Sequence, residues 1–241
     1  MKRFRGRLGT AFIVLGLVAL AYGAAVYFWR DPVTDLYARY QQHQLAGELD
    51  KEFAQWQAQS AEPTSDGGPQ SPAADEATVR RAAEQFAATI EPGDALGRLV
   101  IPRLDIDPVF VNGTEWGRDL SKGPGLYEEA ALPGLGKLSA IAGHRTTFGA
   151  PFRHIDELEA GDRIELELPY GTFTYRVVEH EIVKNDDWSI LEPRSYEALV
   201  LSACHPLYSA SERWIVYARL TQVELPNGQS FEPPKAVAAG T

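Results

Sequence analysis

The sequence predicts an all-β domain of about seven or eight short strands, preceded by a membrane-spanning helix and further helices. Two observations predict this arrangement. An apolar run of 20 uncharged residues lies near the N-terminus, and the hydrophobic pattern changes to a period of two at about residue 95. A single cysteine among 241 residues excludes an internal disulfide and a four-cysteine zinc site. The domain therefore depends on a hydrophobic core.

The charge of the chain is divided between two regions. Lys2, Arg3, Arg5 and Arg7 carry +4 at the start, whereas the whole chain carries −10. The remainder holds 19 basic and 33 acidic residues, a balance of −14. An acidic surface without a cluster of Lys and Arg argues against binding to nucleic acid. The basic N-terminus followed by an apolar run indicates a membrane protein.

The apolar run is TAFIVLGLVALAYGAAVYFW, residues 10–29. As a helix, a run of this length crosses ~30 Å of hydrocarbon. Basic residues before it predict that residues 1–9 are cytoplasmic and that the chain from about residue 31 lies outside the cell. The alternative is a cleaved signal peptide, because Ala19 and Ala21 have the small-residue spacing of a cleavage site. The length of the run, beyond the ~7 to 15 residues of a signal-peptide core, favours the anchor.

Residues 30–94 are predicted to form extracytoplasmic helices and a linker. Apolar residues spaced mostly by three to five predict a helix over 33–58. Residues 60–76 are rich in Pro, Gly, Ser and acidic residues, which predicts a flexible linker. A second helix is predicted over about 75–90, and we expect its apolar face to dock on the domain that follows.

Residues 95–223 contain the strand-like runs, separated by Gly, Pro and Asp/Asn turns. Their short spacing is typical of a closed barrel or a sandwich. One short helix is predicted at PFRHIDEL, residues 151–158. The tail, residues 224–241, is rich in Pro and Gly and is predicted to be flexible.

Three residues of complementary chemistry lie at strand ends. Cys204 closes the run ALVLSAC, His144 closes LSAIAGH, and Arg213 begins the last strand. If the runs 198–204 and 213–223 pair antiparallel, Cys204 and Arg213 meet at one end of the sheet. A thiolate attacks carbonyl carbon, an imidazole transfers protons near neutral pH, and a guanidinium donates hydrogen bonds to an oxyanion. For each of these residues taken alone, a structural role is the better interpretation.

Two long segments contain these residues: AIAGHRTTFGAPFRHIDELEAGDRIEL around His144, and LSACHPLYSASERWIVYARL around Cys204 and Arg213. Both resemble the sortase family, in the expected order, and the Cys-His-Pro form and the upstream IPRLDIDPVFVNGTEWGRDLSKGPGLYEEAALPG resemble class E. The resemblance covers about residues 95–223. It implies a closed eight-stranded β-barrel, a membrane-tethered extracytoplasmic cysteine transpeptidase, and a catalytic set of His144, Cys204 and Arg213.

The same resemblance suggests substrate-binding residues. Tyr127 is similar to a tyrosine that shapes the pocket in class E, and Ser202, Ala203 and His205 flank the cysteine. Ala203 is a departure, because sortases commonly have Thr immediately before the cysteine. His205 is a second candidate for proton transfer, but neighbours on a strand point to opposite faces, which favours His144 over the residue next to Cys204.

The activity implied is cleavage of a Leu-Pro/Ala-x-Thr-Gly-like sorting signal between Thr and Gly, through a thioester, with transfer to an amine. The partners implied are signal-bearing surface proteins and a peptidoglycan precursor or pilin amine. No metal ligand spacing is recognisable, and neither metal nor cofactor is expected. Two alternatives remain: a catalytically silent membrane-anchored binding or assembly module, and an L,D-transpeptidase-like peptidoglycan enzyme.

Overall fold

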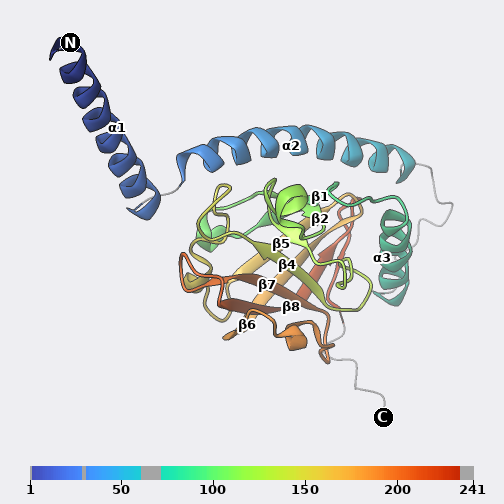
Figure 1. Ribbon diagram of the computed structural model, residues 1–241. Coiled ribbons are helices and arrows are strands. Elements are labelled where there is room, and N and C mark those ends of the chain that lie inside the picture. The colour runs from blue at the N-terminus through green and yellow to red at the C-terminus, as the bar shows by residue number, and fades with distance from the viewer. Residues whose placement is uncertain (1, 29–30, 61–71, 234–241) are drawn as a thin grey trace.

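The computed structural model describes residues 2–28, 31–60 and 72–233, with the side chains of 9–27, 31–58 and 75–233. Helices precede a β-barrel (Figure 1): α1 (Lys2–Phe28), α2 (Pro32–Ser60) and α3 (Pro72–Ala87). The strands are β1 (Ala95–Val100), β2 (Val109–Asn112), β3 (Gly125–Leu126), β4 (Ser139–Gly143), β5 (Arg163–Leu168), β6 (Gly171–Lys184), β7 (Ala198–His205), β8 (Glu212–Glu224) and β9 (Ser230–Phe231).

Eight strands close into a ring. They hydrogen-bond in the order β6-β5-β1-β2-β3-β4-β7-β8, β8 pairs back with β6, and β9 is added alongside β8. The closed eight-stranded barrel is thereby confirmed over the sandwich. Large apolar side chains from around the ring fill its interior, among them Leu99, Ile141, Phe173, Leu201 and Val216. Burial of these side chains supplies the main stabilisation of a fold that has no disulfide.

Three strands determine where the predicted site residues meet. β4 runs parallel to β7, with Gly143 opposite Ala203. β7 runs antiparallel to β8, with Cys204 opposite Arg213, so the predicted antiparallel pairing is confirmed. The ends of β4 and β7 and the beginning of β8 therefore lie together at one end of the barrel.

Two helices pack on the barrel. The inner face of α2 buries Leu45 and Leu49 against residues of β1 and β2. Val79 and Phe86 of α3 belong to the main core, as the pattern of the predicted helix 75–90 indicated. Phe86 contacts Trp56 of α2 edge-on, with ring centroids 6.1 Å apart, so the two helices also contact each other.

Two local predictions differ from the structure. The helix predicted over 151–158 is only a 3-10 turn, η3 (Ile155–Glu157), because its backbone bonds join residues three apart. The tail predicted to be flexible from residue 224 begins folded: β9 pairs with β8, and Leu225 and Phe231 are buried. Residues 61–71 of the predicted linker and residues 234–241 of the tail lie outside the described residues.

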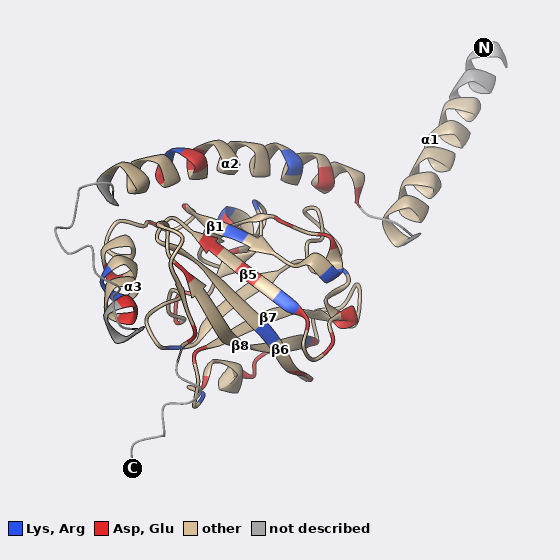
Figure 2. Ribbon diagram, turned by 180° about the vertical axis from the view of Figure 1, so that it is seen from behind, with Lys and Arg blue, Asp and Glu red and all other residues tan. Residues whose placement is uncertain are grey.

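Within the described residues, one helix is long and apolar enough to cross a membrane. The stretch Gly9–Tyr27 of α1 has a mean hydropathy of 2.1, and none of it is buried in the molecule. Figure 1 shows α1 projecting away from the barrel at the start of α2. Figure 2 shows charged residues on α2, α3 and the barrel, and none on the described turns of α1. These features are consistent with the predicted anchor.

Candidate active site

A cavity of about 710 Å³ lies where β4, β7 and β8 meet. His144, Cys204 and Arg213 all line it. Three of the four predicted substrate-binding residues line it as well: Tyr127, Ser202 and Ala203. The barrel thus brings together six predicted residues that are spread over almost ninety positions of the sequence.

Cys204 is a free, half-exposed thiol near the end of β7. Strand register accounts for its neighbours. On one side of β7, Cys204 pairs with Arg213 of β8. On the other side, Ala203 pairs with Gly143 of the parallel strand β4. The next residues along these two strands are Cys204 and His144, so these two residues lie side by side. The three side chains therefore occupy one end of three adjacent strands.

His144 is largely buried, and its environment disfavours the imidazolium ion. Desolvation lowers the pKa of its side chain below the ordinary 6.5, so the ring is predominantly neutral at pH 7. The buried Nε2 atom has no hydrogen-bond partner among the described residues. The backbone carbonyl of His144 accepts a hydrogen bond from the Phe152 amide at 3.0 Å. Because His144 lines the cavity, its neutral imidazole can accept a proton from a group there.

The ring of Phe148 covers His144, at a centroid distance of 5.3 Å. Phe148 and the two residues after it have φ angles of 50°, 76° and 46°, a left-handed run that ordinary side chains disfavour. Helix α2 holds this loop, because the Phe148 amide donates to Oγ1 of Thr34 at 3.1 Å. The Phe148 ring also meets Tyr37 and Trp116 edge-on, at 6.1 and 5.7 Å. α2 and the loop together fix the ring on the histidine.

Arg145 joins the histidine loop to the cysteine strand. Its side chain is only 2% exposed and donates to Asp156 Oδ1 at 2.6 Å and to the Arg153 carbonyl at 3.1 Å. It also lies 3.5 Å from the Cys204 carbonyl oxygen and from Nδ1 of His205. Sequence reasoning missed this residue, since an arginine next to a strand end is usually a solvated charge.

The structure does not bring His205 into the cavity. Its ring lies 5.5 Å from that of Trp214, and Nδ1 faces Arg145. Its position follows from strand alternation, since adjacent residues of a strand point to opposite faces. Ser202, two residues before Cys204, accepts a hydrogen bond from the hydroxyl of Tyr127 at 3.3 Å. The hydroxyl pair lies on the wall of the cavity, close to the cysteine in sequence.

The backbone that connects β7 to β8 orients Arg213. Its guanidinium donates to the carbonyl oxygens of Ala210 and Glu212, at 3.1 and 3.0 Å. A guanidinium has five N–H donors in a planar fork. The remaining donors can bind an oxygen of a molecule in the cavity.

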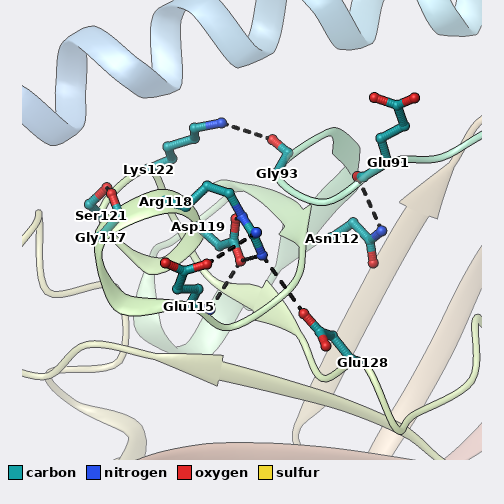
Figure 3. Close-up of polar contacts among 10 residues, drawn as sticks. All are labelled: Glu91, Gly93, Asn112, Glu115, Gly117, Arg118, Asp119, Ser121, Lys122 and Glu128. Carbon is teal, nitrogen blue, oxygen red and sulfur yellow. Dashed lines mark hydrogen bonds and ion pairs between the residues drawn. The ribbon is translucent and has the colours of Figure 1, made fainter.

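A polar network supports the rim of the cavity (Figure 3). Asp119 is fully buried and accepts from Nε of Arg118 at 2.8 Å and from the Glu115 amide at 3.0 Å. Nζ of Lys122 donates to the Gly93 carbonyl at 3.0 Å. These bonds fix the π-helical turn η2 (Trp116–Leu120), whose two end residues line the cavity. Sequence reasoning missed this turn, since a buried aspartate cannot be distinguished from an exposed one in a single sequence.

The family model described as the sortase domain matches residues 99–221 of the chain, a range that includes His144, Cys204 and Arg213. The chain belongs to the sortase family.

Several curated sortases are similar to the chain. Sortase D of Bacillus subtilis (strain 168) is 38% identical over 133 residues, which cover 54% of this chain and 65% of that sortase. Sortase SrtE1 of Streptomyces coelicolor is 26% identical over 230 residues, covering 89% of this chain and 56% of that sortase. The chain thus spans less than two thirds of the length of these sortases. The chain therefore resembles both a class E sortase and sortase D: its identity to sortase D is higher, and its match to SrtE1 is longer.

Solved structures share the fold. Sortase E1 from Streptomyces coelicolor, determined with a tripeptide in its active site, is 26% identical with a TM-score of 0.54 and covers 62% of this chain and 100% of that one. The Clostridium perfringens sortase D5 transpeptidase is 21% identical with a TM-score of 0.58 and covers 75% of this chain and 98% of that one. The barrel is therefore the sortase barrel.

Proposed function

We propose that this sortase is a membrane-anchored cysteine transpeptidase. It cleaves a Leu-Pro/Ala-x-Thr-Gly-like sorting signal between Thr and Gly and transfers the protein to a peptidoglycan or pilin amine. The observation that carries the proposal is the convergence of Cys204, His144 and Arg213 on one open cavity. The tripeptide held in the active site of the related sortase E1 supports a peptide as the occupant of this cavity.

Acylation begins when Sγ of Cys204 attacks the threonine carbonyl carbon while the thiol proton passes to His144. The resulting tetrahedral oxyanion accepts hydrogen bonds from Arg213, a contribution of about 10²–10³ in rate by analogy with single oxyanion-hole donors. His144 then gives its proton to the glycine nitrogen, the C–N bond breaks, and the C-terminal fragment leaves. The enzyme retains the threonine carbonyl as a thioester on Cys204.

Transfer reverses the proton movements. The nitrogen of the incoming amine attacks the thioester carbonyl, and His144 takes up its proton. The C–S bond breaks, an amide bond forms, and the proton returns to the Cys204 sulfur. Because the pKa of His144 is lowered by burial, the ring is in the neutral form that accepts protons at the start of both half-reactions.

The membrane arrangement completes the proposal. α1 serves as a single-pass anchor with the N-terminus in the cytoplasm, and the barrel lies outside the cell. Signal-bearing proteins held in the same membrane then meet the enzyme at a raised effective concentration.

The test uses the full chain in detergent with Leu-Pro-x-Thr-Gly and Leu-Ala-x-Thr-Gly peptides and an added amine. Cys204→Ala is expected to abolish both cleavage and the thioester mass adduct, and His144→Ala to reduce transfer strongly. His154→Ala is the matched control, since His154 is exposed and pairs with Glu157 at 2.8 Å, away from the cavity. Undiminished cleavage by Cys204→Ala would refute the assignment of the nucleophile.

The same experiment addresses the silent binding module, which Ala203 makes worth testing. A silent module forms no thioester with either peptide, and a thiol-reactive peptide mimic modifies its Cys204 slowly and without regard to sequence. The L,D-transpeptidase alternative is disfavoured, because that class places an arginine two residues after the cysteine, where this chain has Pro206.

A further inference from the structure

Four large apolar side chains of α2 are exposed, and all lie within its first nine residues. Val33, Leu36, Tyr37 and Tyr40 are 65%, 72%, 43% and 60% exposed. Their spacing of i, i+3, i+4 and i+7 places them on one face of the helix. Over residues 41–58, no large apolar side chain of α2 is exposed. The exposed apolar stripe is therefore confined to the end of α2 nearest α1.

Most of this stripe lies away from the face that packs on the barrel, since within the described residues only Tyr37 of the stripe contacts the barrel, edge-on against Phe148 at 6.1 Å. Ala38, Leu45 and Leu49 are buried and form the inner face of α2, which lies over β1 and β2. Single exposed apolar residues are common on protein surfaces, but a continuous stripe indicates an interaction surface. The outer stripe of α2 thus needs a partner outside the described fold.

The position of the stripe identifies that partner as a membrane. The membrane-length stretch of α1 ends at Tyr27, and α2 begins at Pro32. The Tyr22 hydroxyl of α1 donates a hydrogen bond to Asp31, the residue before α2, at 2.8 Å. Figures 1 and 2 show α1 rising obliquely from beside the start of α2, away from the barrel. If α1 crosses a membrane, the outer face of the first turns of α2 is directed toward the lipid.

The charges of these turns are compatible with a membrane surface. Asp35 and Arg39 form an ion pair at 2.8 Å, and the Asp35 side chain is largely covered, so the pair adds little net charge. The Arg39 side chain is mostly exposed and can reach lipid phosphate. Tyrosines are enriched at the headgroup level of membranes, where a ring with a polar end is favourable.

We propose that the first nine residues of α2 lie in the headgroup region of the outer leaflet, as a second membrane contact beside α1. The proposal rests on α1 as the membrane anchor and is independent of the catalytic assignment. The proposed membrane contact also bears on the cavity, because two loops near the cavity are hydrogen-bonded to the end of α1 and the start of α2. Thr34 holds the Phe148 loop, and the Tyr208 hydroxyl donates to the carbonyls of Val26 and Tyr27, at 3.2 and 2.5 Å.

The test exploits the single cysteine. In the full chain carrying Cys204→Ala, one cysteine is introduced at a time by Leu36→Cys, Tyr40→Cys or Ala54→Cys and labelled with bimane. Ala54 is the matched control, because it lies on the same helix face as Leu36 but about 27 Å further along. Val18→Cys monitors α1. The proteins are reconstituted in phosphatidylcholine/phosphatidylglycerol vesicles, with or without lipid that carries a nitroxide near the headgroup or deep in the acyl chain.

We expect headgroup nitroxide to remove most of the fluorescence of labels at 36 and 40 and little of that at 54. Deep nitroxide should quench the label at 18. If headgroup nitroxide quenched the labels at 36, 40 and 54 to the same extent, the proposal would be overturned. The proposal would also be overturned if the fluorescence of the label at 36 changed with the protein-to-lipid ratio but not with nitroxide lipid. That result would indicate that a second copy of the chain covers the stripe. An unquenched label at 18 would overturn the proposal by removing the anchor. None of these measurements requires catalysis, so they leave the proposed reaction untouched.

Discussion

Phe148→Ala and Phe148→Gly form a pair of variants that separates the stability of the histidine loop from its effect on the site. Both remove the ring that covers His144 and contacts Tyr37 and Trp116. Loss of two edge-on aromatic contacts costs about 1–3 kcal/mol, at about 0.5–1.5 kcal/mol for each pair. The φ angle of 50° penalises alanine but not glycine, so Phe148→Gly should be about 1 kcal/mol more stable than Phe148→Ala.

The activity of the two variants is expected to fall together. Without the ring, His144 is less restrained and better solvated, so its pKa rises toward 6.5 and the acidic limb of the kcat/KM profile moves to higher pH. The measurements are thermal unfolding of the full chain in detergent and peptide transfer between pH 5 and 8. A Phe148→Gly protein with wild-type kcat/KM and an unshifted acidic limb would refute the positioning role of the ring.

Two further predictions concern stability. Gly143→Ala places a Cβ atom 2.4 Å from the ring of Phe152 in the core, which costs about 1–3 kcal/mol and lowers Tm by several degrees, whereas Gly117→Ala, with nothing within 4 Å, should leave Tm unchanged. Equal Tm values for the two variants would contradict this packing. Burial raises the pKa of Glu197 from 4.5 to about 7, although the Gly134 and Gly136 amides donate to it at 2.6 and 3.1 Å. The folded state then binds more protons than the unfolded state between these pH values, so the contribution of Glu197 to stability falls as pH rises through this window. The Tm of Glu197→Gln minus that of the wild type should therefore increase from pH 4.5 to 7, because only the wild type loses stability there. A difference that does not change with pH would show that Glu197 ionises normally.

Only the family resemblance selected the closed barrel, because the strand pattern and the turn residues predicted an all-β domain that could be a barrel or a sandwich. They also predicted that Cys204 and Arg213 share one sheet end, since a short connection imposes a hairpin. The position of His144 came from a family likeness. Its physical basis, the parallel pairing of β4 with β7, joins strands more than fifty residues apart, which local patterns do not encode.

The residues that support the site could not be predicted from the sequence. Arg145 is buried because it is enclosed by two segments, the stretch 153–156 after β4 and the end of β7, which supply its four partners. Phe148 adopts a left-handed conformation that its own chemistry disfavours and that α2 stabilises. Both depend on tertiary contacts, which override local propensity.

The parallel pairing of β4 with β7 also has a consequence for the order in which the protein matures. β4 ends at Gly143, and its partner β7 begins at Ala198, so the chain between them must be present before the two strands can join. Contacts of such separation form late in folding because a long loop must close first. A chain emerging N-terminus first carries its histidine long before its cysteine and Arg213. The complete cavity therefore forms only after the last long strand, β8, has been synthesised.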